Sequence, residues 1–419
     1  MTRRWLGVPA FVLLAAGAAP HARQVQAQQL QAGDPVQLGF SPERLARIGT
    51  VFQAHVDAGR IAGAQGMILR RGEIAYHQSW GFRDLEARDP LENDDIFRIC
   101  SMTKPVTSVA VMMLWEEGRF ALSDPVARYL PALAGLQVAK LEPGATTATM
   151  QTERPRRPVT IQDLLRHTSG LTYGIFSNTP VDSLYQRANL FGAENLDALV
   201  TKIGELPLVG QPGTRWVYSM STDVLGRLVE VASGMTFDDF LRMRIFAPLE
   251  MKDTDFRVAT ANADRQSRSY RHAGAPLALA PNQGPDACAP AGFPSGGAGL
   301  ASTAHDYARF TQMLLNGGEL NGTRVLGRKT VELMTADHLG DIAGPGAGWG
   351  FGLGFAVKEA VNAGPTSIGT YWWEGLHGTL FWIDPAEELI GIFMVQIYPN
   401  RSTDFKAQFQ QLVYQAIVK

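Results

Sequence analysis

The chain has little cysteine and no strong excess of charge. Its 419 residues include two cysteines, Cys100 and Cys288, too few for a disulfide framework that would replace a hydrophobic core. Lys and Arg total 38 against 40 Asp and Glu, which gives a formal net charge of -2. This balance offers no broad basic surface for nucleic acid or for an anionic membrane. The length is sufficient for a large buried core.

Long apolar runs are missing beyond the N-terminus. Residues 1–27 have the pattern of a secretory signal peptide: two arginines, an apolar run and a small-residue cleavage site at Ala27. The run is short for a transmembrane helix, so a retained membrane anchor is the less favoured alternative. We therefore expect an exported protein, periplasmic or secreted, that is not stably inserted in a membrane after signal removal. Residues 28–39 are expected to form a loose leader.

Several catalytic motifs are also missing. The chain has no Gly-x-Ser-x-Gly elbow and no metal-ligand spacing, which argues against an α/β-hydrolase and a zinc hydrolase. The glycine-rich segment Ser295–Leu300 lacks the GxGxxG spacing after a strand, so we interpret it as a site of close packing. No cofactor or metal ion is expected.

The most informative segment present is Ser101-Met102-Thr103-Lys104. Apolar residues recur at three- and four-residue spacing from Met102 to Leu114, which predicts a helix with one buried face. Residues at i and i+3 share a helix face, so the Ser101 hydroxyl and the Lys104 amine can meet. A serine becomes a good nucleophile when a base accepts its proton, and a lysine with a lowered pKa can be that base. The pattern indicates nucleophilic catalysis.

A second feature is Tyr218, in the loop Gly213–Ser219 before a predicted helix. If its phenol lies beside Lys104, the positive charge is expected to lower the pKa of Tyr218 and allow proton relay.

The order of predicted elements indicates an α+β fold. Strand patterns lie near both ends of the chain, at 66–76 and 380–396, while residues 119–285 are mostly helical. We expect a mixed portion from both chain ends, a helical insertion, and the Ser101 helix at their junction.

These motifs resemble the serine β-lactamase-related superfamily, which includes class C β-lactamases, DD-peptidases and family VIII carboxylesterases. The resemblance covers roughly residues 40–419 and is carried, in family order, by Ser101–Lys104, His167–Leu171, Tyr218-Ser219 and Trp373–Pro385. It implies a β-lactamase/penicillin-binding-protein-like fold, with an antiparallel sheet flanked by helices and an inserted all-helical domain. It also implies an acyl-enzyme mechanism.

The resemblance assigns roles to individual residues. Ser101 would be the nucleophile, Lys104 its base partner and Tyr218 the residue that moves protons. The backbone N–H groups of Ser101 and Leu376 would form the oxyanion hole, and Trp373 and Gly375 would line the substrate site.

Two departures from the β-lactamase pattern affect the expected substrate. Tyr218-Ser219-Met220 replaces Tyr-x-Asn, and Trp373-Glu374-Gly375 stands where these enzymes have Lys-Thr-Gly. Family VIII esterases often have Trp-Gly-Gly, so Glu374 is a variation even among them. Trp373 cannot pair with a substrate carboxylate as a lysine would, but it offers an apolar wall. This favours neutral esters.

We therefore expect an exported serine carboxylesterase acting on esters of small to medium acyl chain. The alternatives are a class C-type β-lactamase or DD-peptidase, an acyltransferase, and a binding module without catalysis. Cys100 is expected to be a small buried residue beside the site; a bridge to Cys288 stays open. His167 is expected to order a helix end, and neither His377 nor Glu374 receives a role.

Overall fold

The computed structural model describes residues 2, 30–273, 278–281, 288, 292–361, 364–399 and 404–419. Apart from residue 2, the predicted signal peptide lies outside the described residues. Among the helices of the described part, none is long and apolar enough to cross a membrane.

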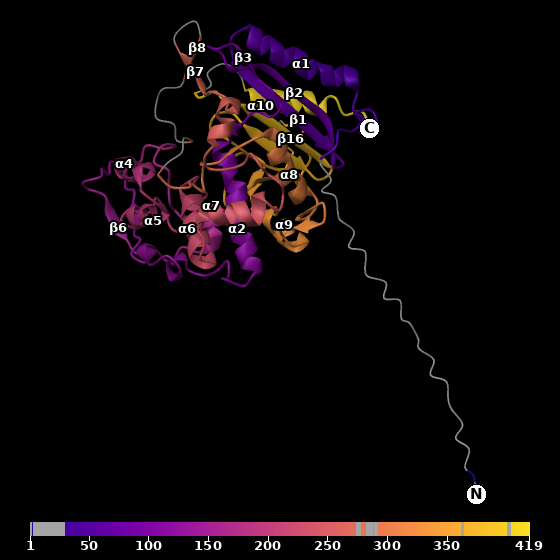
Figure 1. The fold of residues 1–419 in the computed structure, drawn as a ribbon. Coiled ribbons are helices and arrows are strands. Elements are labelled where there is room, and N and C mark those ends of the chain that lie inside the picture. The colour runs from indigo at the N-terminus through magenta and orange to yellow at the C-terminus, as the bar shows by residue number, and fades with distance from the viewer. Residues whose placement is uncertain are drawn as a thin grey trace.

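An eight-stranded antiparallel sheet forms the centre of the fold (Figure 1). Its spatial order is β12-β13-β14-β15-β16-β1-β2-β3, so β16 from the C-terminal part pairs with β1 from the N-terminal part, with Ala64 opposite Val395. The strands are β1 Gly63–Arg70, β2 Glu73–Asp84, β3 Asp89–Pro90, β12 Trp349–Phe351, β13 Ala356–Lys358, β14 Tyr371–Glu374, β15 Leu380–Asp384 and β16 Leu389–Val395.

Helices α1 (Pro42–Asp57) and α10 (Phe405–Tyr414) cover one face of the sheet. The Ser41 side chain caps α1, and a proline occupies its first turn, where a missing N–H costs little. Phe52 of α1 and Phe409 of α10 meet Phe393 of β16, with ring centroids 5.0 Å and 5.1 Å apart respectively. The described part of the predicted leader, 30–39, is not loose: Ala32 pairs with Ile74, and Leu38 is buried.

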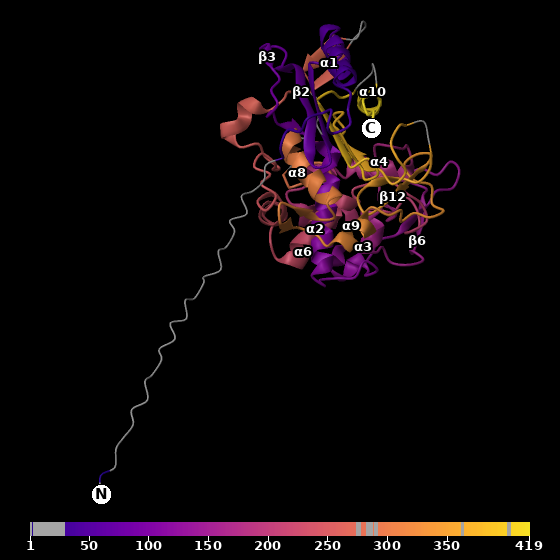
Figure 2. The ribbon, with the colours of Figure 1, turned by 90° about the vertical axis from the view of Figure 1, so that its right-hand side faces the viewer.

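The opposite face carries α2 (Thr103–Glu116) and α8 (Ala304–Leu315). Figure 2 shows α1 and α10 at one end of the molecule and α2, α3 and α6 gathered at the other. Successive side chains of a strand point to opposite faces of the sheet, so one strand contributes to the cores on both faces. Met67 and Leu69 of β1 belong to the core on the α2 side, and Ile68 belongs to the core on the α1 side.

The segment predicted to be mostly helical contains five α-helices and two strand pairs among its described residues. The helices are α3 Ile161–Leu165, α4 Pro180–Arg187, α5 Leu196–Gly204, α6 Ser221–Ser233 and α7 Phe237–Leu241. Other helical segments are the 3-10 turns η2 Val126–Arg128, η3 Pro131–Leu133, η4 Leu190–Gly192 and η6 Thr260–Arg265, and the π-helical turn η5 Arg242–Phe246. The strand pairs are β5 Val138–Lys140 with β6 Gln151–Glu153, and β7 Tyr270–Ala273 with β8 Ala278–Pro281. Tyr270 bridges to Ile397, two residues beyond the end of β16, so the chain has come back beside the end of this strand before residue 285.

The remaining elements are η1 Cys100–Met102, α9 Arg328–Met334, and the pairs β4 Phe97–Arg98 with β9 Ala301–Ser302 and β10 Glu319–Leu320 with β11 Thr323–Arg324. Strand β4 leads into the Ser101 helix, and β9 follows the glycine-rich turn. Because these two strands pair, the turn lies beside the start of the Ser101 helix.

Helix α2 is more buried than its sequence pattern predicted. We expected one buried face, yet every residue from Thr103 to Leu114 is buried. The reason is its position inside the larger hydrophobic core, where α6 and α7 pack against it and leave it no exposed face over this stretch.

Candidate active site

Ser101 lies in the turn η1, immediately before α2, as its motif predicted. The preceding residue, Cys100, has a positive φ of 48° and forms a disulfide with Cys288. The sequence left this pairing open, and the structure shows the bridge. Since the Cys100 sulfur is bonded, it is not available as a thiolate nucleophile.

Lys104 points its amine at Ser101. Its Nζ donates to Ser101 Oγ at 3.2 Å and to the Gly297 carbonyl at 2.7 Å. The side chain is buried, with only 1% of the residue exposed. Burial lowers the pKa of Lys104 to about 7, while the negative charge of Asp223 acts in the opposite direction. A substantial fraction of the amine is therefore neutral near pH 7 and can accept the Ser101 proton.

Tyr218 lies on the other side of the same amine. Lys104 Nζ is 4.6 Å from the centroid of the Tyr218 ring, and Trp373 Nε1 donates to Tyr218 Oη at 3.3 Å. Burial raises the pKa of Tyr218 above its ordinary value, although hydrogen bonding with Ser101 opposes the rise. The expectation that Lys104 lowers this pKa is therefore wrong, because burial disfavours the charged phenolate more strongly. The phenol is protonated at neutral pH.

His167 follows α3 and supports the Tyr218 loop. Its backbone adopts a positive φ of 57°, and its carbonyl accepts the Val217 N–H at 2.8 Å. Its Nδ1 lies 3.2 Å from Ser219 Oγ, and its ring centroid is 5.1 Å from that of Tyr218. Burial, with the nearby Lys104 charge, lowers the pKa of His167 well below 6.5, so the imidazole is neutral. These contacts hold Tyr218 in place.

Asp223, on α6, is a buried acid that the sequence motifs did not reveal. Its Oδ1 accepts from Ser295 Oγ at 2.5 Å and from the Gly297 N–H at 3.1 Å, while its Oδ2 has no partner among the described residues. Burial raises the pKa of Asp223, and Lys104 opposes the rise. Acidic residues are common in the first turn of helices, so nothing in the local sequence distinguished Asp223 from other such residues.

The glycine-rich turn approaches this acid closely, as its composition predicted. A Cβ on Gly297 would lie 2.5 Å from Asp223 Oδ2 and 2.7 Å from Tyr173 Oη. Only glycine allows the turn to come near enough for its carbonyl to receive the Lys104 amine.

Gly375 allows a second close approach, at the end of β14. A Cβ there would lie 2.5 Å from the Ile99 carbonyl oxygen, two residues before Ser101. The next residue, Leu376, lines the cleft with Ser101, and no acceptor for its N–H occurs among the described residues.

A cleft of about 460 Å³ opens at Ser101 and has a largely aromatic lining. Its walls are Phe176, Trp216, Tyr218, Pro345, Trp349, Trp372, Trp373, Glu374, Gly375, Leu376 and Lys406. A recess of about 40 Å³ adjoins Ser101 on the side of Tyr173, Phe191 and Ala298. Five of the six predicted site residues thus line one cleft, and the sixth, Lys104, is buried behind Ser101 and contacts its Oγ. The sequence did not single out most of the aromatic walls or Lys406.

A larger hollow, of about 610 Å³, lies elsewhere and is lined by residues such as Gln31, Gly72 and Glu388. It contains neither Ser101 nor Lys104. The paired nucleophile and base, and not size, therefore identify the candidate active site.

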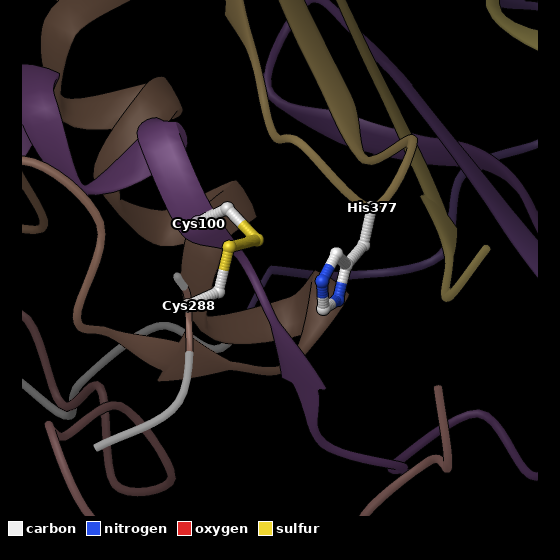
Figure 3. Close-up of side chains that lie close together, drawn as sticks. All are labelled: Cys100, Cys288 and His377. Atoms are coloured by element: carbon white, nitrogen blue, oxygen red, sulfur yellow. A yellow bond between two sulfur atoms is a disulfide. The ribbon is translucent and has the colours of Figure 1, made fainter. Parts of the chain in front are cut away.

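Figure 3 shows the Cys100–Cys288 bridge with the His377 ring directed toward it. The two sulfurs and a ring nitrogen of His377 lie within 4.8 Å of one another. Cysteine binds metal ions as a thiolate. In the disulfide form neither sulfur is a thiolate, so this cluster is not a metal site in the oxidised protein. His377 is buried, and its carbonyl accepts the Ile397 N–H at 2.9 Å.

Comparisons with known proteins agree with the motifs. The family model described as Beta-lactamase matches residues 48–415. Protein Rv1367c of Mycobacterium tuberculosis is 38% identical, over 84% of this chain and 90% of that protein. Esterase EstB of Burkholderia gladioli is 31% identical, over 84% of this chain and 91% of that protein.

A solved structure shares the fold. EstCE1, described as a hydrolase with promiscuous acyltransferase activity, superimposes with a TM-score of 0.73 at 27% identity, covering 89% of this chain and 99% of that one. The predicted resemblance and fold class are confirmed.

Proposed function

Because this chain belongs to the Beta-lactamase family, near its carboxylesterases, we propose that it is a serine carboxylesterase acting on esters of small to medium acyl chain. The observation that carries the proposal is the buried Lys104 amine, 3.2 Å from Ser101 Oγ, at the end of an aromatic cleft. Lys104 supplies a base whose pKa lies near neutral pH, where general base catalysis is most effective.

In the proposed acylation step, neutral Lys104 accepts the Ser101 proton while Oγ attacks the ester carbonyl. The developing oxyanion is held by the backbone N–H groups of Ser101 and Leu376; preorganised donors of this kind contribute several kcal/mol to transition-state stabilisation. The Leu376 N–H has no acceptor among the described residues and so can serve a substrate.

Tyr218 completes the proton path to the leaving alcohol. Its phenol, protonated because burial raises its pKa, donates to the departing oxygen, and protonated Lys104 then returns a proton to the Tyr218 phenolate. Water then attacks the acyl-enzyme by the reverse route and releases the acid.

The lining of the cleft supports ester substrates over β-lactams. Trp373 stands where a lysine would bind the carboxylate of a β-lactam, and its indole instead donates to Tyr218. A β-lactamase or DD-peptidase is therefore less well supported. Acyl transfer to an alcohol is the second candidate, because EstCE1 combines hydrolase and acyltransferase activity and the same acyl-enzyme can serve both.

We also propose that the protein is exported. The pattern of residues 1–27 supports this, and so does the Cys100–Cys288 disulfide, since such bonds persist mainly in oxidising compartments.

The test compares p-nitrophenyl butyrate with a chromogenic cephalosporin on the purified mature protein, with Ser101→Ala as the control. We expect rapid ester cleavage that the variant loses, and slow cephalosporin turnover. Faster cephalosporin turnover would favour a β-lactamase. Absence of Ser101-dependent turnover of both substrates, with or without an added alcohol acceptor, would reject the proposed mechanism.

A further inference from the structure

We propose that Lys406 is a latent carboxylate-binding group of the cleft, and that Glu374 occupies it so that the enzyme selects neutral alcohols in its esters. The inference rests on the proposed esterase function and concerns the specificity of the same site. It starts from one ion pair: Lys406 Nζ lies 2.5 Å from Glu374 Oε2.

The pair lies in the cleft wall. Both residues line the 460 Å³ cleft with Ser101, and the other lining residues are aromatic, aliphatic, glycine, proline or serine. Among the residues that the structure describes, the cleft wall therefore carries one positive and one negative side chain, and they are bound to each other. With the pair intact, this described part of the wall has no net charge and no ammonium group free for a substrate.

The two charges come from different elements. Glu374 is the last residue of β14, one position before Gly375, whereas Lys406 is in the first turn of α10. The side chains are 41% and 29% exposed, respectively, so either one can be replaced without a buried charge being left unpaired. The nearby Asp404 is engaged as the α10 cap, where its Oδ1 accepts the Ala407 N–H at 3.1 Å.

The dimensions of the site place the alcohol part of an ester on the side of this pair. The recess beside Ala298 has about 40 Å³ and accommodates a small acyl group, whereas the Trp-lined cleft has room for an aromatic ring. A carboxylate on that ring meets Glu374, which repels it and blocks Lys406. A neutral ring contacts Trp349 and Trp372 without such a penalty.

The alternative occupant is a cation. Aromatic rings and a carboxylate together can bind a quaternary ammonium group. Lys406 argues against this, because it already neutralises Glu374 at 2.5 Å. The experiment therefore includes a cationic substrate.

The experiment uses three acetate esters that share an acyl group and a phenol ring: those of 3-hydroxybenzamide, 3-hydroxybenzoic acid and 3-hydroxy-N,N,N-trimethylanilinium. We measure kcat/KM relative to the neutral ester, so that general changes in activity cancel. The wild type should prefer the neutral ester. Glu374→Gln should raise the relative value for the carboxylate ester by about fivefold, the upper range for a partly exposed ion pair. Added salt should reduce the gain.

Two further variants make the test specific. In Glu374→Gln/Lys406→Met the gain for the carboxylate ester should disappear. Lys406→Met alone should raise the relative value for the cationic ester, because Glu374 is then unpaired, and this variant remains informative if Glu374→Gln folds poorly. The matched control is Glu332→Gln, which removes an exposed carboxylate paired with Lys329 on α9 and should leave all ratios unchanged.

The outcomes separate the two proposals. Ser101-dependent hydrolysis of the neutral ester with ratios unchanged in Glu374→Gln and Lys406→Met would overturn the ion-pair inference and leave the esterase function standing. A wild type that prefers the trimethylammonium ester would overturn it as well. Loss of Ser101-dependent hydrolysis of all three esters would count against the proposed function itself.

Discussion

Asp223 and Lys104 hold opposite sides of the same peptide segment. The carboxylate accepts the Gly297 N–H at 3.1 Å, and the amine donates to the Gly297 carbonyl at 2.7 Å. Through this turn, and through its charge, Asp223 both positions the amine and raises its pKa against the effect of burial. The position and the pKa of the proposed base thus depend on an acid from a different helix.

The first prediction concerns pH. Lys104 must be neutral to accept the Ser101 proton, and its pKa is about 7. The kcat/KM for p-nitrophenyl butyrate should therefore fall about tenfold per pH unit below this pKa and level off above it. A profile measured between pH 5 and 9 tests this; a rate that is flat down to pH 5 would contradict the assignment of Lys104 as the base.

Asp223→Asn should move that profile. The amide keeps an oxygen for Ser295 and Gly297 but loses the negative charge that raises the pKa of Lys104. The midpoint should shift to lower pH. Asp197→Asn, which removes an exposed carboxylate on α5, is the control and should leave the midpoint unchanged. A midpoint that stays in place in Asp223→Asn would show that the charge does not act on Lys104.

Replacement of the proton-transfer residues should impair turnover without unfolding the protein. Lys104→Ala and Tyr218→Phe should each lower kcat/KM by about 10²-fold or more, in line with general acid–base contributions. Tyr76→Phe removes a hydroxyl from β2, where it donates to Gln78, and should retain normal activity. If either active-site variant turned over substrate at nearly the normal rate, that residue would have no part in the mechanism.

Gly375→Ala should damage the site through backbone contact. The added Cβ would meet the Ile99 carbonyl at 2.5 Å, so the end of β14 or the Ser101 turn must move. We expect a loss of activity of about tenfold or more and a decrease of about 1–3 kcal/mol in the free energy of unfolding. Gly135→Ala is the control, because a Cβ there has no atom within 4 Å. Full activity in Gly375→Ala would show that the close approach is unimportant.

Removal of the disulfide should lower stability. The bridge joins residues 188 positions apart and ties Cys288 to the residue before Ser101. Reduction, or Cys100→Ser/Cys288→Ser, should decrease the free energy of unfolding by about 2–4 kcal/mol, measured by denaturant titration. The double variant should no longer respond to a reductant. A reductant effect that persisted in this variant would have another origin.

The amino-acid sequence by itself determined the local parts of this protein. The Ser41-Pro42 start of α1, the β1–β2 hairpin around Gly72 and the placing of Ser101 one turn before Lys104 follow from spacing, capping and turn residues. These features depend on neighbours within a few positions, which is why they can be predicted. Family resemblance added Leu376 and gave a catalytic role to Tyr218, a residue that its loop position had already indicated.

Only the tertiary structure decided which distant segments meet and how deeply they are buried. Asp223 reaches Lys104 through the Gly297 turn, Glu374 pairs with Lys406 of the last helix, and Cys100 bonds to Cys288. Topology sets these contacts across long sequence separations. Burial likewise reversed the expected shift in the pKa of Tyr218, because desolvation depends on the whole surrounding core and not on the neighbouring residues in the chain.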